Sequence, residues 1–356
     1  MTAERTFTAW VMTGRGEPCV ERTEPCPAAP PGEALIEVAG CGVCHTDISF
    51  LHFGVPTRAE LPLALGHEIS GTVVEMGAGG DQNLVGKPVL VPAVLPCGEC
   101  DLCQNDQRRI CRGQVMPGND RHGGFASFVT VPARYLCPVG DKVLAKHELW
   151  EISVVADALT TPFQAIRNSG LAAGELAICI GAGGIGIHAV QIAAAVGAKV
   201  IALDIDAGKL QTARQHGADA VIDVSGLDGK ELKGQVKAAA KELGAPKFCW
   251  KIFEMSGTRP GQAAAFSLLG FGGYLAIVGF TLDKIEIRPS NLMAFDATMA
   301  GNWGCDPVLY AEVLEWIADG RLQLSPFVEK HDLSQINAVL DAAHAGELQK
   351  RAVLVP

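Results

Sequence analysis

The chain has 356 residues, of which 48% are hydrophobic and 19% charged, a composition typical of soluble globular proteins and sufficient for two domains with separate cores. Its formal net charge of −10 disfavours nucleic acid or an anionic membrane as a general partner. The N-terminus lacks the basic start and apolar core of a secretion signal, and no apolar run approaches the roughly 18 residues that span a bilayer, so we expect a cytoplasmic protein.

Residues 1–155 predict a β-rich first half of the chain. Short alternating runs, separated by Gly and Pro, occur at 34–40, 70–79, 87–94 and 126–139, without a long amphipathic helix pattern between them. The run at 34–40 leads into CGVCHTDISF, residues 41–50, which places two cysteines, a histidine and an aspartate just past a predicted strand end. Side chains at such a position can converge on a cleft.

The spacing of Cys41 and Cys44 has three interpretations: a redox pair, half of a zinc site, or two unrelated buried thiols. Cys41 occupies the strand end, which favours a buried thiol. Cys44 can combine with His67 and an acid, for which Asp157 is the candidate, and such a set leaves one position open on a zinc ion. A lone Cys or His is more often a core residue, and Asp157 alone could be a helix cap, so this set depends on the resemblance described below.

A stronger metal signal comes from four cysteines within 15 residues that are rich in turn formers: Cys97, Cys100, Cys103 and Cys111. Four thiolates make a closed tetrahedral zinc site, and two-residue spacers let a tight loop present successive sulfurs to one ion. The alternative for the chain's 12 cysteines, a disulfide framework, is disfavoured in a reducing compartment. We therefore expect a structural zinc ion that shapes a lobe and does not react.

Residues 176–206 predict a strand, a glycine turn, an Ala-rich helix ending at Gly197, and a second strand. The turn contains Gly181, Gly183 and Gly186, and Asp204 ends the second strand 18 residues after the last of these glycines. This pattern is typical of dinucleotide binding, in which the glycines allow the turn, the approach of the pyrophosphate and close packing of the helix.

Asp204 can accept hydrogen bonds from the ribose hydroxyls and would repel a 2′-phosphate, so we expect NAD as the cofactor and not NADP. Lys209, five residues further on, could also reach the ribose. Strand and helix patterns alternate on to about residue 280, which predicts a mostly parallel, doubly wound sheet. From about Gly301 two amphipathic helices follow, at 306–320 and 333–346.

These features together resemble the zinc-containing medium-chain alcohol dehydrogenase family over nearly the whole chain. The motifs are GVCHTD at 42–47, GHE at 66–68, the four cysteines at 97–111 and GAGGIG at 181–186, in the family's order. The resemblance implies an α/β protein with a β-rich GroES-like catalytic domain and a Rossmann domain. We expect the first at 1–158, the NAD-binding domain at 159–300, and a return to the catalytic domain at 301–356.

Carried over by position, the resemblance makes Cys44, His67 and Asp157 ligands of a catalytic zinc ion, with Glu68 beside the metal. It makes Asp47 the acid that orients a ligand histidine and Thr46 the hydroxyl that passes a proton. It assigns a set of cofactor contacts: His45, Gly181, Gly183, Gly184, Ile185, Gly186, Asp204, Lys209 and Val278. The chain departs from the family at Ser49, where many members have a histidine that finishes the proton relay, and His52 lies one helical turn further on.

The reaction implied is oxidation of an alcohol, with hydride transfer to NAD. Several small-alcohol members carry a large aromatic where this chain has Ala93, so we expect a wide pocket. The overall resemblance is to the bacterial branch that oxidises 6-hydroxycyclohex-1-ene-1-carbonyl-CoA in anaerobic aromatic degradation. The alternatives are a dehydrogenase or enone reductase for another cyclic compound, or a non-catalytic zinc- and nucleotide-binding redox sensor.

An acyl-CoA substrate needs cations for its phosphates on a chain of negative charge. The densest cations are Arg108, Arg109, Arg112 and Arg121, around the four-cysteine segment. Alternatively, these arginines lie on a solvated surface of the lobe and pair with Asp101 and Asp106. We also expect a homo-oligomer, either a dimer or a tetramer.

Overall fold

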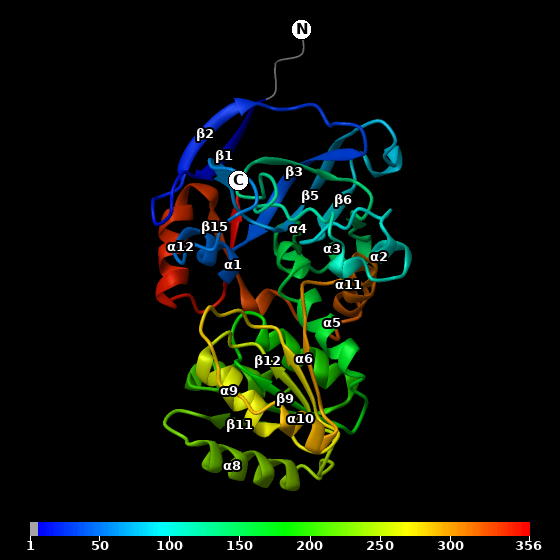
Figure 1. The fold of residues 1–356 in the computed structure, drawn as a ribbon. Helices are drawn as coiled ribbons and strands as arrows, with labels where there is room; N and C mark the ends of the chain where they lie inside the picture. The colour runs from blue at the N-terminus through cyan, green and yellow to red at the C-terminus, as the bar shows by residue number, and fades with distance from the viewer. Residues whose placement is uncertain (1–5) are drawn as a thin grey trace. The chain divides into compact units, whose positions relative to one another are not determined.

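The computed structural model describes residues 6–356 (Figure 1), which form two compact units. One unit runs to Thr160 and also contains Gly304–Asp319 and Gln323–Pro356, whereas the other contains Thr161–Trp303 and Gly320–Leu322. The chain thus passes from the first unit to the second after residue 160 and returns to the first after residue 303. The sequence predicts these boundaries after residues 158 and 300. No helix within residues 6–356 combines the length and the apolar character that crossing a bilayer requires.

The first unit is built on antiparallel strands. Its larger sheet has the order β15-β16-β3-β5-β6-β8, with β7 paired to β3, and a smaller sheet has the order β2-β1-β4. The strands are β1 (Thr6–Met12), β2 (Val20–Pro25), β3 (Glu33–Gly42), β4 (Leu63–Ala64), β5 (Glu68–Met76), β6 (Pro88–Val91), β7 (Phe128–Pro132), β8 (Cys137–Pro138), β15 (Val328–Asp332) and β16 (Arg351–Val355). Strand β3 pairs with β5, β7 and β16, and it ends next to the first cysteine motif.

Helices in the first half of the chain are short, as the β-rich pattern predicts. They are α1 (His45–Leu51), α2 (Asp101–Gln104), α3 (Asp141–Leu144) and α4 (Leu149–Ile152), with 3₁₀ helices η1 (Gln82–Leu84), η2 (Arg108–Ile110) and η3 (Ser153–Ala156). The C-terminal part adds η4 (Pro307–Leu309), α11 (Tyr310–Ala318), η5 (Ser325–Phe327), η6 (Leu333–Gln335) and α12 (Ile336–Ala345). Ile336 and Leu340 of α12 share a buried core with Ile36 and Ile69 of the large sheet.

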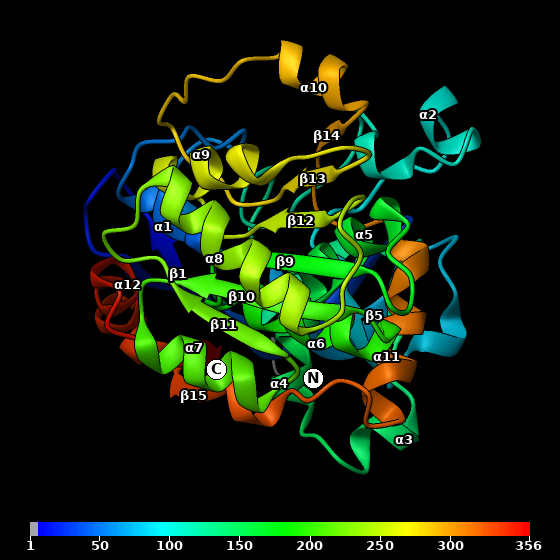
Figure 2. The ribbon, with the colours of Figure 1, turned by 90° about the horizontal axis from the view of Figure 1, so that it is seen from below.

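The second unit is a parallel sheet with the strand order β11-β10-β9-β12-β13-β14; Figure 2 shows β11, β10, β9 and β12 side by side. Its strands are β9 (Leu176–Ile180), β10 (Lys199–Asp204), β11 (Ala220–Asp223), β12 (Lys251–Glu254), β13 (Tyr274–Ile277) and β14 (Thr298–Gly301). Its helices are α5 (Thr160–Ser169), α6 (Gly186–Val196), α7 (Ala207–Gln215), α8 (Gly229–Glu242), α9 (Arg259–Leu268) and α10 (Ser290–Phe295). This order, which reverses direction at β9, confirms the predicted doubly wound Rossmann sheet.

Candidate metal centres and cofactor site

Helix α1 begins directly after Cys44, whose extended backbone forms the N-cap. Asp47 accepts a hydrogen bond from the backbone N–H of Cys44 at 2.9 Å, and its other oxygen accepts one from the backbone N–H of Gly66 at 3.1 Å. An acid in the first turn of a helix is favoured because it satisfies free N–H groups there. The fully buried Asp47 carboxylate therefore ties together the segments that carry Cys44 and His67.

The position of His67 depends on the glycine before it. Gly66 has a φ of +92°, and an added Cβ there would lie 2.6 Å from the Cys41 sulfur, so a larger residue does not fit. The Nδ1 atom of His67 faces Asp47 at 3.6 Å, and its Nε2 atom lies 3.7 Å from Oδ2 of Asp157. Asp47 thus fixes the ring and leaves Nε2 as the free ligand atom.

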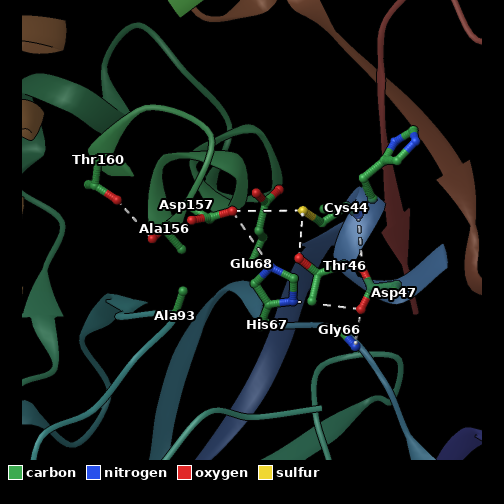
Figure 3. Close-up of polar contacts among 12 residues, drawn as sticks. Cys44, Thr46, Asp47, Gly66, His67, Glu68, Ala93, Ala156, Asp157 and Thr160 are labelled. Atoms are coloured by element: carbon green, nitrogen blue, oxygen red, sulfur yellow. Dashed lines mark hydrogen bonds and ion pairs between the residues drawn. The ribbon is translucent and has the colours of Figure 1, made fainter. Parts of the chain in front are cut away.

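Four side chains, Cys44, His67, Glu68 and Asp157, point toward one another (Figure 3), with their ligand atoms all within 4.8 Å. Oδ2 of Asp157 is 3.7 Å from the sulfur of Cys44 and 3.7 Å from Nε2 of His67. Atoms of these types bound to one tetrahedral zinc ion lie about 3.3–3.5 Å apart. A slight contraction would accommodate zinc, and the donor set is typical of sites that keep one position open.

Glu68 differs from the other three because its charge is already paired. Its carboxylate accepts hydrogen bonds from Nε and Nη2 of Arg351 at 2.7 and 2.5 Å. Strand β3 lies between the two residues, and an added Cβ on Gly42 would stand 2.1 Å from Oε2 of Glu68. The glycine of the GVCHTD motif therefore makes room for this ion pair. The pKa of Glu68 is raised to about 7, because the effect of burial outweighs the opposing effect of the Arg351 charge.

The hydroxyl of Thr46 lies at the cluster, 3.6 Å from the sulfur of Cys44. The hydroxyl of Ser49 instead donates to the backbone carbonyl one turn earlier in α1, at 2.8 Å. The ring of His52 stacks on that of His344, with centroids 4.4 Å apart. Ser49 and His52 thus contact groups outside the cluster. Of these three residues, Thr46 is the one that contacts a proposed metal ligand, Cys44.

The four cysteines of the 97–111 segment converge, as their spacing predicts. Their sulfur atoms lie 3.5 Å (Cys97 to Cys111), 3.6 Å (Cys100 to Cys103), 3.7 Å (Cys100 to Cys111) and 3.9 Å (Cys97 to Cys103) apart. Two sulfurs bound to one tetrahedral zinc ion lie about 3.8 Å apart. Backbone N–H groups of Glu99 and Cys100 lower the pKa of Cys97 to about 6, which favours the thiolate that a metal requires.

Replacing Cys97→Ser is expected to remove one of two zinc ions per chain and to lower the thermal unfolding midpoint by about 5 °C or more, because metal binding at such a lobe contributes to folding. Metal analysis and thermal melts measure both effects. Cys249→Ser, at an exposed cysteine of the second unit, is the matched control and should change neither. Two zinc ions and an unchanged midpoint in Cys97→Ser would refute the structural role.

Two of the four arginines near this lobe are bound to acids. Arg108 donates from Nε to both carboxylate oxygens of Asp306, each at 3.1 Å, and from Nη1 to Asp106 at 2.8 Å. Arg121 binds both oxygens of Glu33 at 2.9 and 2.8 Å. The sequence-based pairing of these arginines is therefore right for Asp106, but the main partner of Arg108 is Asp306.

The predicted cofactor residues of the second unit follow strands that end at one level. Ile180 of β9 pairs with Leu203 and Glu254, and Glu254 pairs with Ile277. The residues that come next in each strand therefore share one edge of the sheet, and they include Gly181, Asp204 and Val278. Ligands of open parallel sheets bind at this carboxyl edge, where the strand order reverses.

The glycine turn has the geometry that a dinucleotide requires. Gly181 has a φ of +85°, and an added Cβ on Gly186 would lie 1.7 Å from the carbonyl oxygen of Gly181. An added Cβ on Gly183 would meet nothing within 4 Å, so this backbone is open to an approaching group. Gly184 is exposed, and Ile185 is the N-cap of α6. The turn thus fits a pyrophosphate at the start of the helix.

The Asp204 carboxylate is held by backbone N–H groups. Oδ2 accepts from Ala182 at 2.7 Å, and Oδ1 accepts from Ile205 and Asp206 at 2.8 and 3.0 Å. This arrangement connects the end of β10 to the glycine turn and leaves lone pairs for ribose hydroxyls. Lys209 is exposed in the first turn of α7.

Sequence reasoning did not identify Arg351 or Tyr310. Arg351 pairs with Glu68 from a strand near the C-terminus, and the fully buried Tyr310 contacts the backbone beside Asp157. Both residues lie far along the chain from the motifs that they contact. An arginine at the start of a short apolar run, as in 351–355, is the signal that could have pointed to a buried acid.

Two segments of the chain match family descriptions of known proteins. Residues 30–141 match the alcohol dehydrogenase GroES-like domain, and residues 184–319 match the zinc-binding dehydrogenase domain. An alcohol dehydrogenase from Geobacillus stearothermophilus is 31% identical over 324 residues, which cover 91% of each chain.

Two solved structures are similar over almost their full length. Acetophenone reductase from Geotrichum candidum, solved in complex with NAD, has a TM-score of 0.86 and 26% identity, and the match covers 100% of this chain and 98% of that one. The alcohol dehydrogenase of the archaeon Aeropyrum pernix has a TM-score of 0.86 and 26% identity, with 98% of this chain and 100% of that chain covered.

Proposed function

Because the chain belongs to the zinc-binding medium-chain alcohol dehydrogenase family, we propose that Cys44, His67 and Asp157 hold a catalytic zinc ion in an NAD-dependent alcohol dehydrogenase. The observation that carries this proposal is the convergence of one thiolate, one imidazole and one carboxylate at zinc-like spacing. The four cysteines hold a second, structural zinc ion.

Each residue around the proposed catalytic zinc has a distinct task. The bound ion supplies Lewis-acid polarisation of a substrate oxygen. Asp47 keeps the His67 ring oriented through Nδ1. Thr46, beside Cys44, is placed to accept the proton of the substrate hydroxyl. Arg351 balances the charge of Glu68, which leaves this acid beside the metal without adding a further net charge.

The cofactor residues are part of the same proposal. Gly181, Gly183, Gly184, Ile185 and Gly186 hold the pyrophosphate, Asp204 and Lys209 the ribose, and Val278 lines the nicotinamide end of the sheet edge. His45, an exposed residue at the start of α1, contacts the pyrophosphate. When bound, NAD would supply the hydride acceptor for oxidation of the alcohol.

For the substrate we propose a bulky cyclic secondary alcohol, with 6-hydroxycyclohex-1-ene-1-carbonyl-CoA in anaerobic benzoyl-CoA degradation as the specific candidate. Ala93, a small buried residue where several small-alcohol members of the family carry a large aromatic, supports a wide pocket. A relative of similar fold that reduces acetophenone, a ketone attached to a ring, supports a cyclic substrate. Arg109 and Arg112 are the arginines of the lobe that we propose for an acyl-CoA carrier.

The proposal extends to the setting of the enzyme. We propose a cytoplasmic homo-oligomer, a dimer or tetramer, that takes a small-molecule substrate and has no nucleic-acid or membrane partner. Its catalytic domain comprises residues 1–158 and 301–356, and its NAD-binding domain comprises residues 159–300.

The substrate class is tested with a panel of alcohols in the presence of NAD. We expect kcat/KM for cyclohex-2-en-1-ol to exceed that for ethanol about 100-fold, because the larger ring fills an apolar pocket. Ala93→Phe should reduce this ratio, and a thermal melt checks that the variant folds. Equal kcat/KM values for both alcohols would reject the cyclic substrate class.

The acyl carrier requires a separate comparison. If Arg109 and Arg112 bind CoA phosphates, replacing both with Ala should raise KM for the thioester about tenfold and leave KM for the free ring alcohol unchanged. Arg134→Ala, at an exposed arginine paired with Glu99, is the matched control. An equal change for both substrates would remove these arginines as the carrier site.

A further inference from the structure

Tyr310, the first residue of α11, is fully buried. Its hydroxyl oxygen accepts a hydrogen bond from the backbone N–H of Ala93 at 3.1 Å and donates to the backbone carbonyl of Ala156. A buried tyrosine hydroxyl that bridges two separate backbone segments fixes one relative to the other. One segment is the stretch between β6 and the four-cysteine lobe, which contains Ala93. The other contains Ala156, the residue before Asp157.

The Ala156 carbonyl belongs to the peptide group that links Ala156 to Asp157. It also accepts a hydrogen bond from the hydroxyl of Thr160 at 2.9 Å (Figure 3), and the N–H of Asp157 donates to the carbonyl of Val154. Because a peptide group is planar and rigid, these contacts fix the carbonyl and the N–H of the same plane. The backbone position from which the Asp157 side chain extends is therefore fixed by the hydroxyls of Tyr310 and Thr160 and by one backbone hydrogen bond.

The helix that carries Tyr310 is itself attached to the four-cysteine lobe. Asp306 lies four residues before Tyr310 and caps η4 by accepting from the N–H of Val308 at 3.2 Å. Both oxygens of Asp306 also accept from Nε of Arg108, which lies in η2 between Cys103 and Cys111. The lobe, the start of α11 and the Asp157 peptide thus form one continuous set of contacts within the first unit.

We propose that Tyr310 is a positioning residue that holds the Asp157 carboxylate in place for the catalytic metal, and that the Asp306–Arg108 pair anchors Tyr310 to the structural zinc lobe. This inference rests on the proposed function insofar as Asp157 is taken as a zinc ligand. It gives the four-cysteine lobe a task beyond its own folding, since the lobe stabilises one ligand of the other metal site.

The effect acts through ligand geometry and not through the reacting atoms. Metal sites tolerate displacements of only about 0.5 Å before affinity and reactivity decline. Loss of a group that orients a ligand typically lowers metal affinity about 10- to 100-fold. Tyr310→Phe removes only the hydroxyl and leaves the ring in its buried position.

The first test measures zinc release from the full-length protein to a chromophoric chelator. Wild type should release its two zinc ions in a fast and a slow phase, and Tyr310→Phe should accelerate the phase of the catalytic ion about tenfold. With cobalt in the catalytic site, the visible absorption bands of the ion should shift in the variant, because they report ligand geometry. Tyr274→Phe, a tyrosine of the second unit, is the matched control and should change neither signal.

A folded Tyr310→Phe variant with unchanged zinc release and unchanged cobalt bands overturns the positioning role. If Tyr310→Phe does not fold, Thr160→Val removes the other hydroxyl at the same carbonyl and must shift the same bands for the role to stand. Neither zinc release nor the cobalt absorption bands depend on a substrate. Failure to oxidise any alcohol would therefore reject the proposed function, and the positioning role would still be decided by these two measurements.

The link to the lobe is tested by Asp306→Asn, which keeps the side-chain size and removes the charge that binds Arg108. We expect a shift of the cobalt bands in the same direction as in Tyr310→Phe, and a double variant whose shift is smaller than the sum of the two. Unshifted bands in a folded Asp306→Asn variant would overturn the anchoring by the lobe.

Discussion

Asp157→Asn is expected to lower kcat about 10³-fold and to reduce the zinc content from two ions to one per chain. The amide that replaces the carboxylate is a neutral and weaker ligand, so the catalytic ion is lost while the four-cysteine ion stays. Loss of about 4 kcal/mol of charge stabilisation at the substrate oxygen corresponds to this decrease in rate. Steady-state kinetics and metal analysis on the same sample measure both quantities.

A matched control for this variant is Asp81→Asn. Asp81 caps η1 by accepting from the N–H of Asn83, and asparagine is an equally good cap. The control should therefore keep two zinc ions and wild-type turnover. An Asp157→Asn enzyme with two zinc ions and normal kcat would contradict the ligand assignment.

Asp204→Asn is expected to narrow the preference for NAD over NADP by about 10- to 100-fold in kcat/KM. The change removes the charge that repels a 2′-phosphate and weakens the acceptor for ribose hydroxyls, which amounts to about 1.5–3 kcal/mol. Asparagine retains one oxygen, so the contact to the N–H of Ala182 can persist and the glycine turn keeps its support. Initial rates with each cofactor at a fixed alcohol concentration measure the ratio.

Asp206→Asn is the control at the neighbouring carboxylate. Asp206 is the N-cap of α7 and accepts from the N–H of Lys209 at 3.0 Å, a role that asparagine also fills. Its cofactor ratio should equal that of wild type. If Asp206→Asn changed the NAD-to-NADP ratio and Asp204→Asn did not, the ribose contact would have to be assigned to Asp206.

The fold was predictable because its main elements have strong local patterns. The glycine turn and the strands around it were confirmed as β9, α6 and β10, and the two predicted C-terminal helices correspond to α11 and α12. Strands β1, β2, β14, β15 and β16 were not predicted. The last three are only four or five residues long, and strand pairing between distant segments leaves little trace in so short a run.

The residues of the two candidate metal sites also divide into those that local sequence predicts and those that it does not. The four cysteines lie close in the sequence, so their convergence follows from spacing alone. Cys44, His67 and Asp157 lie on separate segments, and only the resemblance to a family joins them before the structure is known. The ion pair of Glu68 with Arg351 joins residues 283 positions apart. The apolar run that follows Arg351 hints at a buried partner, but no local pattern identifies Glu68 as that partner.

The account is tested most directly by returning zinc to an enzyme that has lost only its catalytic ion. A chelator removes that ion while the four-cysteine site keeps its own, and zinc is then added in steps during oxidation of cyclohex-2-en-1-ol by NAD. We predict that NADH formation rises in proportion to added zinc, reaches a plateau at one ion per chain, and does not recover in Asp157→Asn. Full activity before any zinc is added, or equal recovery in Asp157→Asn, would contradict a catalytic zinc ion held by Cys44, His67 and Asp157.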